Sequence, residues 1–198
     1  MIQSIVFDIG WVFVNLNPRP ILDCLAEHDC ENLDLNALVT RVRLGEHETG
    51  RMTGSGLMEA VAALARKPCA VDLLRSKWVD MFELQPRMVD LAHRLSDRYR
   101  VYLLSNIGDL HWSHLCREYG FHRIGHGALP SFVAGCMKPD PAIYAEAERR
   151  FGLEPRSTVF IDDREENVRA ARARGWGAIE HTGFHSTVSA LQVLGVRT

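Results

Sequence analysis

The sequence predicts an α/β fold, with a parallel sheet between two layers of helices and a small helical insert. Three observations lead to this expectation. Short, continuous apolar runs alternate with segments of helical periodicity, three of these runs end at polar side chains, and one long stretch without strand-like runs interrupts the alternation. Continuous apolar strands are typical of sheets covered on both faces, and strand–helix alternation is typical of parallel sheets.

Four apolar runs are predicted strands: residues 5–7, 101–104, 158–161 and 178–179. The first three are followed by polar side chains: Asp8, then Ser105 and Asn106, then Asp162 and Asp163. In open parallel sheets, ligands bind beyond the carboxyl ends of the strands. We therefore expect these polar groups to meet at one edge of the sheet.

Apolar residues at helical spacing predict helices within residues 88–95, 143–151 and 168–171. Residues 18–86 differ, because they have helical spacing but no strand-like run. We expect a core formed by residues 1–17 and 87–198, and a helical cap formed by residues 18–86. The insert leaves the sheet just after Asp8, so it can fold over the edge as a lid.

Composition narrows the class of function. The 198 residues are 46% hydrophobic and 24% charged, with a formal net charge of −2, so no global field attracts nucleic acid or an anionic membrane. The five cysteines are an odd number without a CxxC pair and are expected to be reduced. No basic leader precedes the first strand, and no apolar run approaches the roughly 18 residues that span a bilayer. We expect a cytoplasmic protein that acts on a small molecule, as a monomer or a dimer.

Each candidate residue also has a structural interpretation. Asp8 could belong to an Asx-turn, and Ser105 and Asn106 could cap a helix. Lys138 could be a solvated turn residue. However, the prolines that follow it restrict the local backbone, which helps its side chain to point in one direction.

Asp162 and Asp163 place two like charges side by side, which favours a bound cation or a raised pKa. The alternative is a capping pair formed by Asp163 and Glu166 at the start of the next helix. A zinc site among the histidines and Cys116 of residues 111–126 is not expected, because their spacing matches no compact site.

The order of the motifs resembles that of the haloacid dehalogenase superfamily, which is dominated by magnesium-dependent phosphohydrolases. The four matching motifs are Phe7-Asp8-Ile9-Gly10, Leu104-Ser105-Asn106, Lys138-Pro139-Asp140-Pro141-Ala142-Ile143-Tyr144 and Val159-Phe160-Ile161-Asp162-Asp163-Arg164-Glu165-Glu166-Asn167. The pattern is most similar to the branch with a small helical cap, and within it to sugar-phosphate phosphatases such as glucose-1-phosphate phosphatase. The resemblance implies a Rossmann-like three-layer α/β/α core and hydrolysis of a small phosphorylated metabolite, with a sugar phosphate as the expected substrate.

The resemblance also implies roles in catalysis and substrate binding. Asp8 would attack phosphorus and form an aspartyl-phosphate that water later hydrolyses. Ser105 and the backbone amide of Asn106 would hold phosphoryl oxygens. Lys138 would neutralise charge on the nucleophile and on the transferring group.

The implied cofactor is Mg²⁺. The resemblance implies that Asp8, the Gly10 carbonyl and Asp163 would hold it, with Asp162 the less favoured ligand of the acidic pair. Asn167 would orient this acidic loop without binding the metal itself.

One position departs from the usual motif. Most phosphatases of the superfamily carry a second Asp two residues after the nucleophile, as general acid and base, whereas this chain has Gly10. Such proton transfer is commonly worth about 10²–10⁴-fold in rate, so we expect a slow enzyme or one with a good leaving group. Trp11 occupies the next position, where a small residue is usual. We therefore expect it to change the geometry of the loop or the space for substrate.

Two rival functions remain. A metal-independent dehalogenase would also use an aspartyl nucleophile, but dehalogenases of the superfamily lack the acidic pair seen at Asp162 and Asp163. A regulatory protein that binds a phosphate ligand with weak or no turnover is the second rival. Substrate choice is expected to lie in the cap, whose most polar stretch contains Glu46, His47 and Arg51.

Overall fold

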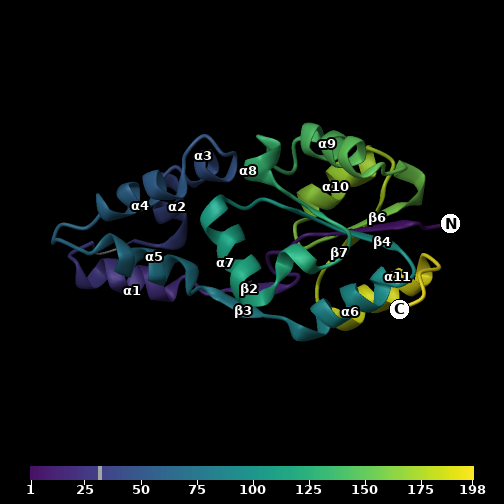
Figure 1. Cartoon of the computed structure of the whole chain (residues 1–198), viewed down its shortest axis with the longest axis horizontal. Coiled ribbons are helices and arrows are strands. Elements are labelled where there is room, and N and C mark those ends of the chain that lie inside the picture. The colour runs from purple at the N-terminus through teal and green to yellow at the C-terminus, as the bar shows by residue number, and fades with distance from the viewer. Residues whose placement is uncertain (31–32) are drawn as a thin grey trace.

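A five-stranded parallel sheet forms the centre of one lobe of the molecule (Figure 1). The computed structural model describes residues 1–30 and 33–198. The strands lie in the order β5-β4-β1-β6-β7, with these bounds: β1 Ser4–Phe7, β4 Arg100–Ser105, β5 Ala128–Pro130, β6 Thr158–Asp162 and β7 Gly177–Glu180. The four strands predicted from apolar runs are confirmed. The edge strand β5 was not predicted.

Helices cover both faces of this sheet, as expected for a Rossmann-like core. One face packs against α6 (Pro86–Ser96), α7 (Asp109–Tyr119) and α11 (Phe184–Val193), and the other against α9 (Pro141–Phe151) and α10 (Glu165–Ala173). Alternate residues of each strand point to opposite faces, so Phe7 belongs to the first hydrophobic cluster and Val6 to the second. Short elements complete this lobe: α8 Ser131–Ala134 and the 3₁₀ turns Phe121–Arg123 and Pro155–Ser157.

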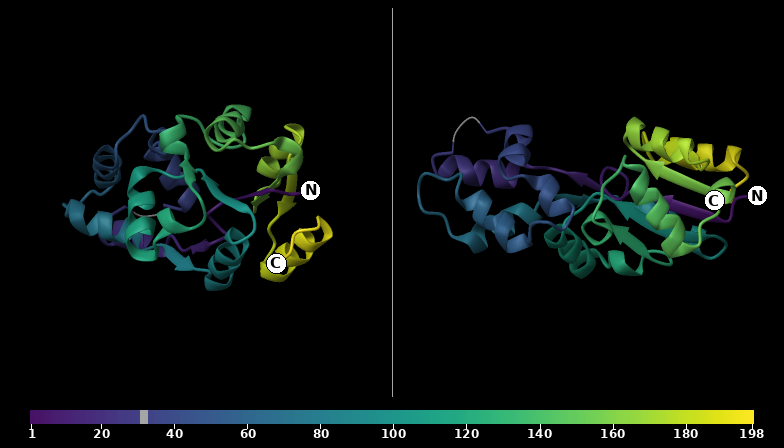
Figure 2. Two further views of the ribbon diagram at one scale, coloured as in Figure 1. Left: turned by 45° about the vertical axis from the view of Figure 1, so that its right-hand side comes forward. Right: turned by 90° about the horizontal axis from the view of Figure 1, so that it is seen from above.

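The helices between Leu16 and Phe82 form a second lobe beside the sheet (Figure 2). They are α1 Arg19–Glu27, α2 Leu35–Arg41, α3 Leu44–Glu48, α4 Gly54–Ala62 and α5 Val71–Val79. Their buried side chains make a hydrophobic cluster of their own, centred on residues such as Leu25, Leu57 and Trp78. We call this lobe the cap. Both chain termini lie at the end of the molecule away from it.

The connection between the lobes contains two strands that the sequence pattern did not indicate. β2 (Val14–Leu16) and β3 (Phe82–Leu84) pair in antiparallel fashion. The expectation that residues 18–86 hold no strand is therefore wrong. Strands of three residues are too short for alternation to reveal them.

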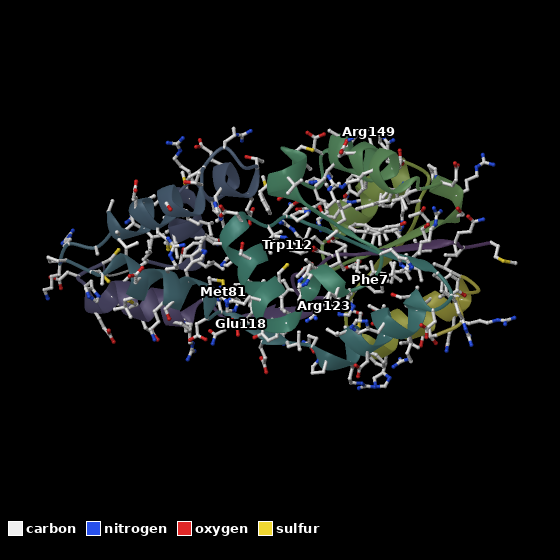
Figure 3. The ribbon with its side chains drawn as sticks, viewed as in Figure 1. Phe7, Met81, Trp112, Glu118, Arg123 and Arg149 are labelled. Atoms are coloured by element: carbon white, nitrogen blue, oxygen red, sulfur yellow. The ribbon has the colours of Figure 1, made fainter. Side chains whose placement is uncertain are left out.

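The cap rests on the core through α3 and α5 (side chains in Figure 3). The His47 imidazole lies against Gly108, where a Cβ atom would come within 2.1 Å of the ring. Ser131 Oγ donates a hydrogen bond to the carbonyl of Glu48, and His111 Nε2 donates to the carbonyl of Trp78 at 3.1 Å. Among residues 1–30 and 33–198, no helix combines the length and apolar character needed to cross a membrane.

Candidate active site

Polar groups from three neighbouring strands meet at the carboxyl edge of the sheet. Asp8 follows β1, which lies between β4 and β6, and Phe7 is in register with Leu103 and Ile161. This register places Asp8 between the ends of the two flanking strands, where Ser105 and Asp162 lie. The predicted convergence at one edge is therefore present in the structure.

Lys138 joins two of these carboxylates. Its Nζ lies 2.8 Å from Asp8 Oδ1 and 2.6 Å from Asp162 Oδ2, and the residue is only 4% exposed. The solvated-turn interpretation of Lys138 is therefore wrong. Burying an ammonium group away from water is costly unless it is paired, and here two carboxylates pair with it and raise its pKa against the effect of burial, which alone would lower it.

Asn106 fixes the backbone of Lys138. Its side-chain amide donates to the Lys138 carbonyl at 2.8 Å, and its Oδ1 accepts from the Lys138 N–H at 2.8 Å. The family resemblance implied that the backbone amide of Asn106 would hold a phosphoryl oxygen. It did not indicate that the Asn106 side chain would hold the backbone of Lys138. Neither Asn106 nor Ser105 caps the following helix, because α7 begins after Gly108.

Both oxygens of Asp162 are already bound by protein groups. Oδ2 accepts from Lys138, and Oδ1 accepts from the Asn167 side chain and the Arg164 N–H, each at 2.9 Å. The N-cap of α10 is Arg164, whose side chain makes no capping bond. The alternative prediction, that Asp163 and Glu166 form a capping pair, is therefore wrong.

Asp8, Asp162 and Asp163 bring carboxylate oxygens within 4.8 Å of one another. Burial is the main cause that raises the pKa of Asp163 to about 6, and the charges of Asp8 and Asp162 raise it further. Burial also raises the pKa of Asp8, against the opposing effect of Lys138. Crowded carboxylates of this kind suit a hard cation such as Mg²⁺, which prefers oxygen ligands. Asp8 and Asp163 fit that role better than Asp162, whose oxygens are occupied.

A cavity of about 690 Å³ lies between this edge and the cap. Its polar groups include Glu48, Ser105, Asn106 and Arg164. Apolar side chains from both lobes make most of its wall: Ile9, Trp11, Val14, Leu16, Pro18, Leu35, Leu38, Val39, Leu44, Trp78, Met81, Phe82 and Ile107.

Glu48 is the acidic residue that the cap contributes to this cavity. Burial raises its pKa to about 7, the charge of Asp8 raises it as well, and Arg164 and Lys138 oppose the rise. The sequence analysis pointed instead to Glu46, His47 and Arg51, none of which lines the cavity. Glu46 forms an ion pair with Arg43, and His47 is buried against the core. One sequence signal could have identified Glu48. It is four residues after Leu44, and this helical spacing puts both residues on the same face of α3.

Gly10 and Trp11 line the cavity next to Asp8. A Cβ atom on Gly10 would make ordinary contact, 3.7 Å from Leu16, so the space for a side chain exists. Trp11 has a left-handed backbone (φ 56°) and is 49% exposed. The loop therefore accommodates a large residue whose side chain lines the cavity.

A comparison with protein families matches residues 29–175 to the haloacid dehalogenase-like hydrolases. The match covers most of the chain. The protein belongs to this family of hydrolases. It is therefore an enzyme of the hydrolase class, as the four motifs indicated.

Two distant relatives of this hydrolase match most of its length. D-Ribitol-5-phosphate phosphatase of Bacteroides thetaiotaomicron is 24% identical over 89% of this chain and 90% of its own. A sesquiterpene phosphatase of Aspergillus oryzae is 22% identical over 97% of this chain and 96% of its own. A crystal structure of a haloacid dehalogenase-family enzyme of B. thetaiotaomicron, in complex with magnesium and inorganic phosphate, superimposes with a TM-score of 0.86. It covers 95% of this chain and 99% of its own at 22% identity, which shows the shared fold.

Proposed function

We propose that the protein is a Mg²⁺-dependent phosphatase that hydrolyses a small phosphorylated metabolite through an aspartyl-phosphate on Asp8. The observation that carries the proposal is the buried group of Asp8, Lys138 and Asp162 at the carboxyl edge of the sheet, next in the chain to cavity-lining residues such as Ile9 and Gly10. A carboxylate kept at a strand end with a buried lysine has the chemistry of an activated nucleophile. The names of the two curated relatives, both phosphatases, support the same activity.

The contacts of Asp8 suggest how it would react. Oδ1 accepts from the Ile9 N–H at 2.7 Å and from Lys138, so Oδ2 is the oxygen that we expect to attack phosphorus. Formation of the new O–P bond would release the alcohol of the substrate. Ser105 and the Asn106 N–H would hold phosphoryl oxygens, and Lys138 would balance their charge.

A bound Mg²⁺ would neutralise negative charge on the phosphoryl group and on the carboxylates around it. We assign its ligands to Asp8, the Gly10 carbonyl and Asp163, with Asp162 engaged by Lys138 instead. Asn167 would keep Asp162 oriented through its 2.9 Å hydrogen bond.

Proton transfer needs a residue other than Gly10. Glu48 lines the cavity together with Gly10, and a carboxyl group of the cap at that place can protonate the leaving alcohol and later accept a proton from water. We therefore propose Glu48 for the proton transfer that a second Asp performs in most phosphatases of the superfamily.

Each of the two rival functions predicts its own assay result. A dehalogenase would release halide from a 2-haloacid in the presence of EDTA, which the acidic pair of Asp162 and Asp163 argues against. A regulatory protein would bind phosphate without turnover, but it would have no evident need for a nucleophile such as Asp8.

The decisive assay is phosphate release from a panel of sugar phosphates and other phosphomonoesters, with Mg²⁺ and with EDTA. We expect turnover that needs Mg²⁺ and disappears in Asp8→Asn, while Asp90→Asn, an exposed change on α6, has no effect. Turnover retained by Asp8→Asn would contradict the proposal. Phosphate binding without any turnover would favour the regulatory protein.

A further inference from the structure

The cavity wall is apolar where the leaving group of a substrate would lie. Trp11 and Leu35 line the cavity and are 49% and 41% exposed, so both present apolar surface to it. Their neighbours in the wall come from both lobes, for example Leu16 in the connection and Leu38 in α2.

Polar side chains of the wall are largely engaged within the protein. Thr40 Oγ1 donates to the Asn36 carbonyl at 2.8 Å, and His111 Nε2 bonds the Trp78 carbonyl. The Trp78 indole N–H has no partner among the described residues, but its nitrogen is buried. A polyol would bring several hydroxyl groups, and each one buried without a partner costs binding free energy.

From this distribution we infer that the substrate is the phosphate monoester of an apolar alcohol, rather than a sugar phosphate. The inference rests on the proposed phosphatase function and narrows its substrate class. The phosphate would lie at the end formed by Ser105 and Asn106, and the apolar group would lie against the wall. A cavity of 690 Å³ is within the range that holds a drug-sized group. The sesquiterpene phosphatase among the relatives acts on a substrate of this chemical kind.

The test compares kcat/KM for geranyl phosphate with that for D-ribitol 5-phosphate and glucose 1-phosphate, with acetyl phosphate as a small substrate that does not reach the wall. We expect geranyl phosphate to be favoured by about 10²-fold, because its apolar surface is buried on binding. Equal or better turnover of the sugar phosphates would overturn the inference and leave the proposed function intact. No turnover of any substrate, acetyl phosphate included, would instead count against the proposed function.

A matched pair of variants sharpens this test. Leu35→Gln places a polar group in the wall, whereas Leu73→Gln changes a cap leucine of the same 41% exposure that does not line the cavity. Leu35→Gln should lower kcat/KM for geranyl phosphate by about tenfold and lower that for acetyl phosphate much less. Leu73→Gln should change neither. Equal effects of the two variants on geranyl phosphate would contradict the assigned wall.

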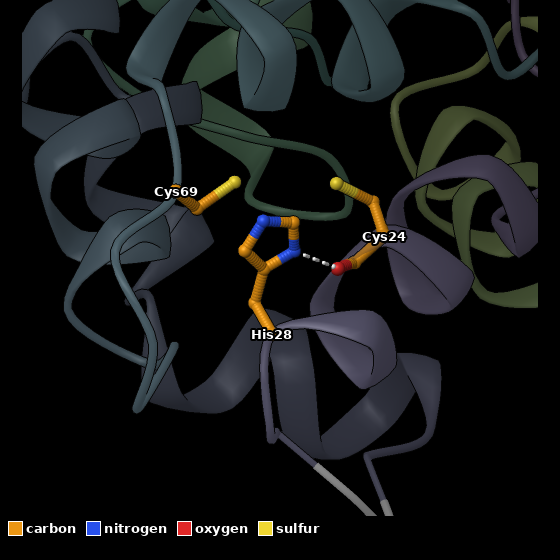
Figure 4. A group of neighbouring side chains, drawn as sticks. All are labelled: Cys24, His28 and Cys69. Atoms are coloured by element: carbon orange, nitrogen blue, oxygen red, sulfur yellow. Dashed lines mark hydrogen bonds between the residues drawn. The ribbon is translucent and has the colours of Figure 1, made fainter.

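A second inference comes from a different part of the cap, away from the cavity. The side chains of Cys24, His28 and Cys69 bring their ligand atoms within 4.8 Å of one another (Figure 4). Cys24 lies in α1, His28 is the C-cap of that helix, and Cys69 lies in the segment before α5. Both cysteines are free thiols.

The imidazole of His28 is already oriented for coordination. Its Nδ1 donates to the Cys24 carbonyl at 2.8 Å, which leaves the lone pair on Nε2, on the side of the ring nearer Cys69. Such a hydrogen bond from the non-coordinating nitrogen is the usual way in which metal-binding histidines are held. The His28 carbonyl accepts from the N–H groups of Arg66 and Lys67 at 3.0 and 3.2 Å, which fixes the segment that carries Cys69.

We propose that Cys24, His28 and Cys69 form a binding site for Zn²⁺ or a similar soft divalent cation. Thiolate and imidazole are the ligands that Zn²⁺ prefers, and three protein ligands leave one position for water. Without a metal, burial and the neighbouring Cys69 raise the pKa of the Cys24 thiol. A bound cation would stabilise the thiolates instead.

Cobalt substitution of the reduced, full-length protein tests this site. We expect one equivalent of Co²⁺ to give thiolate-to-metal charge-transfer absorption, and Zn²⁺ to abolish it by competition. Cys69→Ser should lose the absorption, and Cys136→Ser, which removes a thiol outside the group, should keep it. Absence of the bands in the wild type, or their persistence in Cys69→Ser, would overturn the proposal. Because Cys69 is partly exposed, a melting curve of Cys69→Ser with an unchanged midpoint in the absence of metal confirms that the variant is folded.

Discussion

The edge of the sheet and the wall of the cap face the same cavity but are built differently. At the edge, charged groups are buried and paired, with Lys138 between Asp8 and Asp162 and Asn167 behind them. The cap side is apolar apart from a few groups, chiefly the carboxyl of Glu48. We therefore propose that the core supplies the reaction chemistry and that the cap selects the substrate and contributes the proton.

The largest expected effect comes from breaking the charged group. In Lys138→Met, two buried carboxylates lose their cation, so we expect the free energy of unfolding to fall by about 3–5 kcal/mol. We also expect at least ~10³-fold loss of turnover, because a charge that stabilises the transition state is removed. Urea unfolding and steady-state kinetics measure the two effects. Near wild-type turnover in a folded Lys138→Met would contradict the assigned role of the lysine.

Proton transfer by Glu48 should have the next largest effect. Glu48→Gln keeps the shape of the side chain but cannot exchange a proton, so we expect about 10²-fold lower kcat for a substrate with a poor leaving group. The loss should be much smaller for acetyl phosphate, whose leaving group needs no proton.

The space beside Gly10 offers a rescue experiment. A Cβ atom there makes only ordinary contact with Leu16, so Gly10→Asp should be tolerated and should restore turnover to Glu48→Gln. If Gly10→Asp has no effect in that background, the loss in Glu48→Gln does not come from proton transfer.

The contact between the cap and the core should be weakened by a substitution of Gly108. In Gly108→Ala the new methyl group would meet the His47 ring at 2.1 Å, so α3 must move away from the core. We expect a loss of about 1–3 kcal/mol in the free energy of unfolding and an altered KM, because Glu48 is carried on the same helix. Gly45→Ala is the control for stability, because its Cβ would make only ordinary contact, 3.6 Å from Met137. It does not control for KM, since Gly45 also lines the cavity.

An effect that is absent at neutral pH concerns acid stability at the contact between the lobes. Burial lowers the pKa of His111 to about 4, from an ordinary value of 6.5. As the pH falls, the unfolded chain therefore binds a proton at His111 before the folded protein does. The free energy of unfolding then decreases between about pH 6.5 and 4, by up to ~3 kcal/mol. His111→Gln should lose this part of the pH dependence in urea unfolding, and the exposed His93→Gln should retain it. The same pH dependence in both variants would show that another group causes it.

The sequence predicted the edge of the sheet better than the cap. Asp8 and Asp162 follow strong apolar runs, so a local pattern places them at strand ends, and the parallel sheet then brings them together. The short strands β2, β3 and β5 gave no such pattern. The role of Asn106 in holding Lys138 depends on a contact between distant segments.

The cap was harder to interpret from the sequence. Which of its residues reach the cavity depends on how the cap docks on the core. Glu46, His47 and Glu48 are adjacent in the sequence, and a one-residue step around α3 decides which one reaches the cavity. Cys24 and His28 have the i, i+4 spacing that puts both on one helix face, but Cys69 joins them only through the folded loop.

The most direct test of the account is to trap the covalent intermediate. Wild-type protein is mixed with Mg²⁺ and acetyl phosphate, quenched in acid within the first turnover and digested for peptide mass spectrometry. We predict one added phosphoryl group on the peptide that contains Asp8, absent when EDTA replaces Mg²⁺. Turnover with no phosphorylated peptide, or with the group on another residue, would contradict the claim that the core edge performs the chemistry through Asp8.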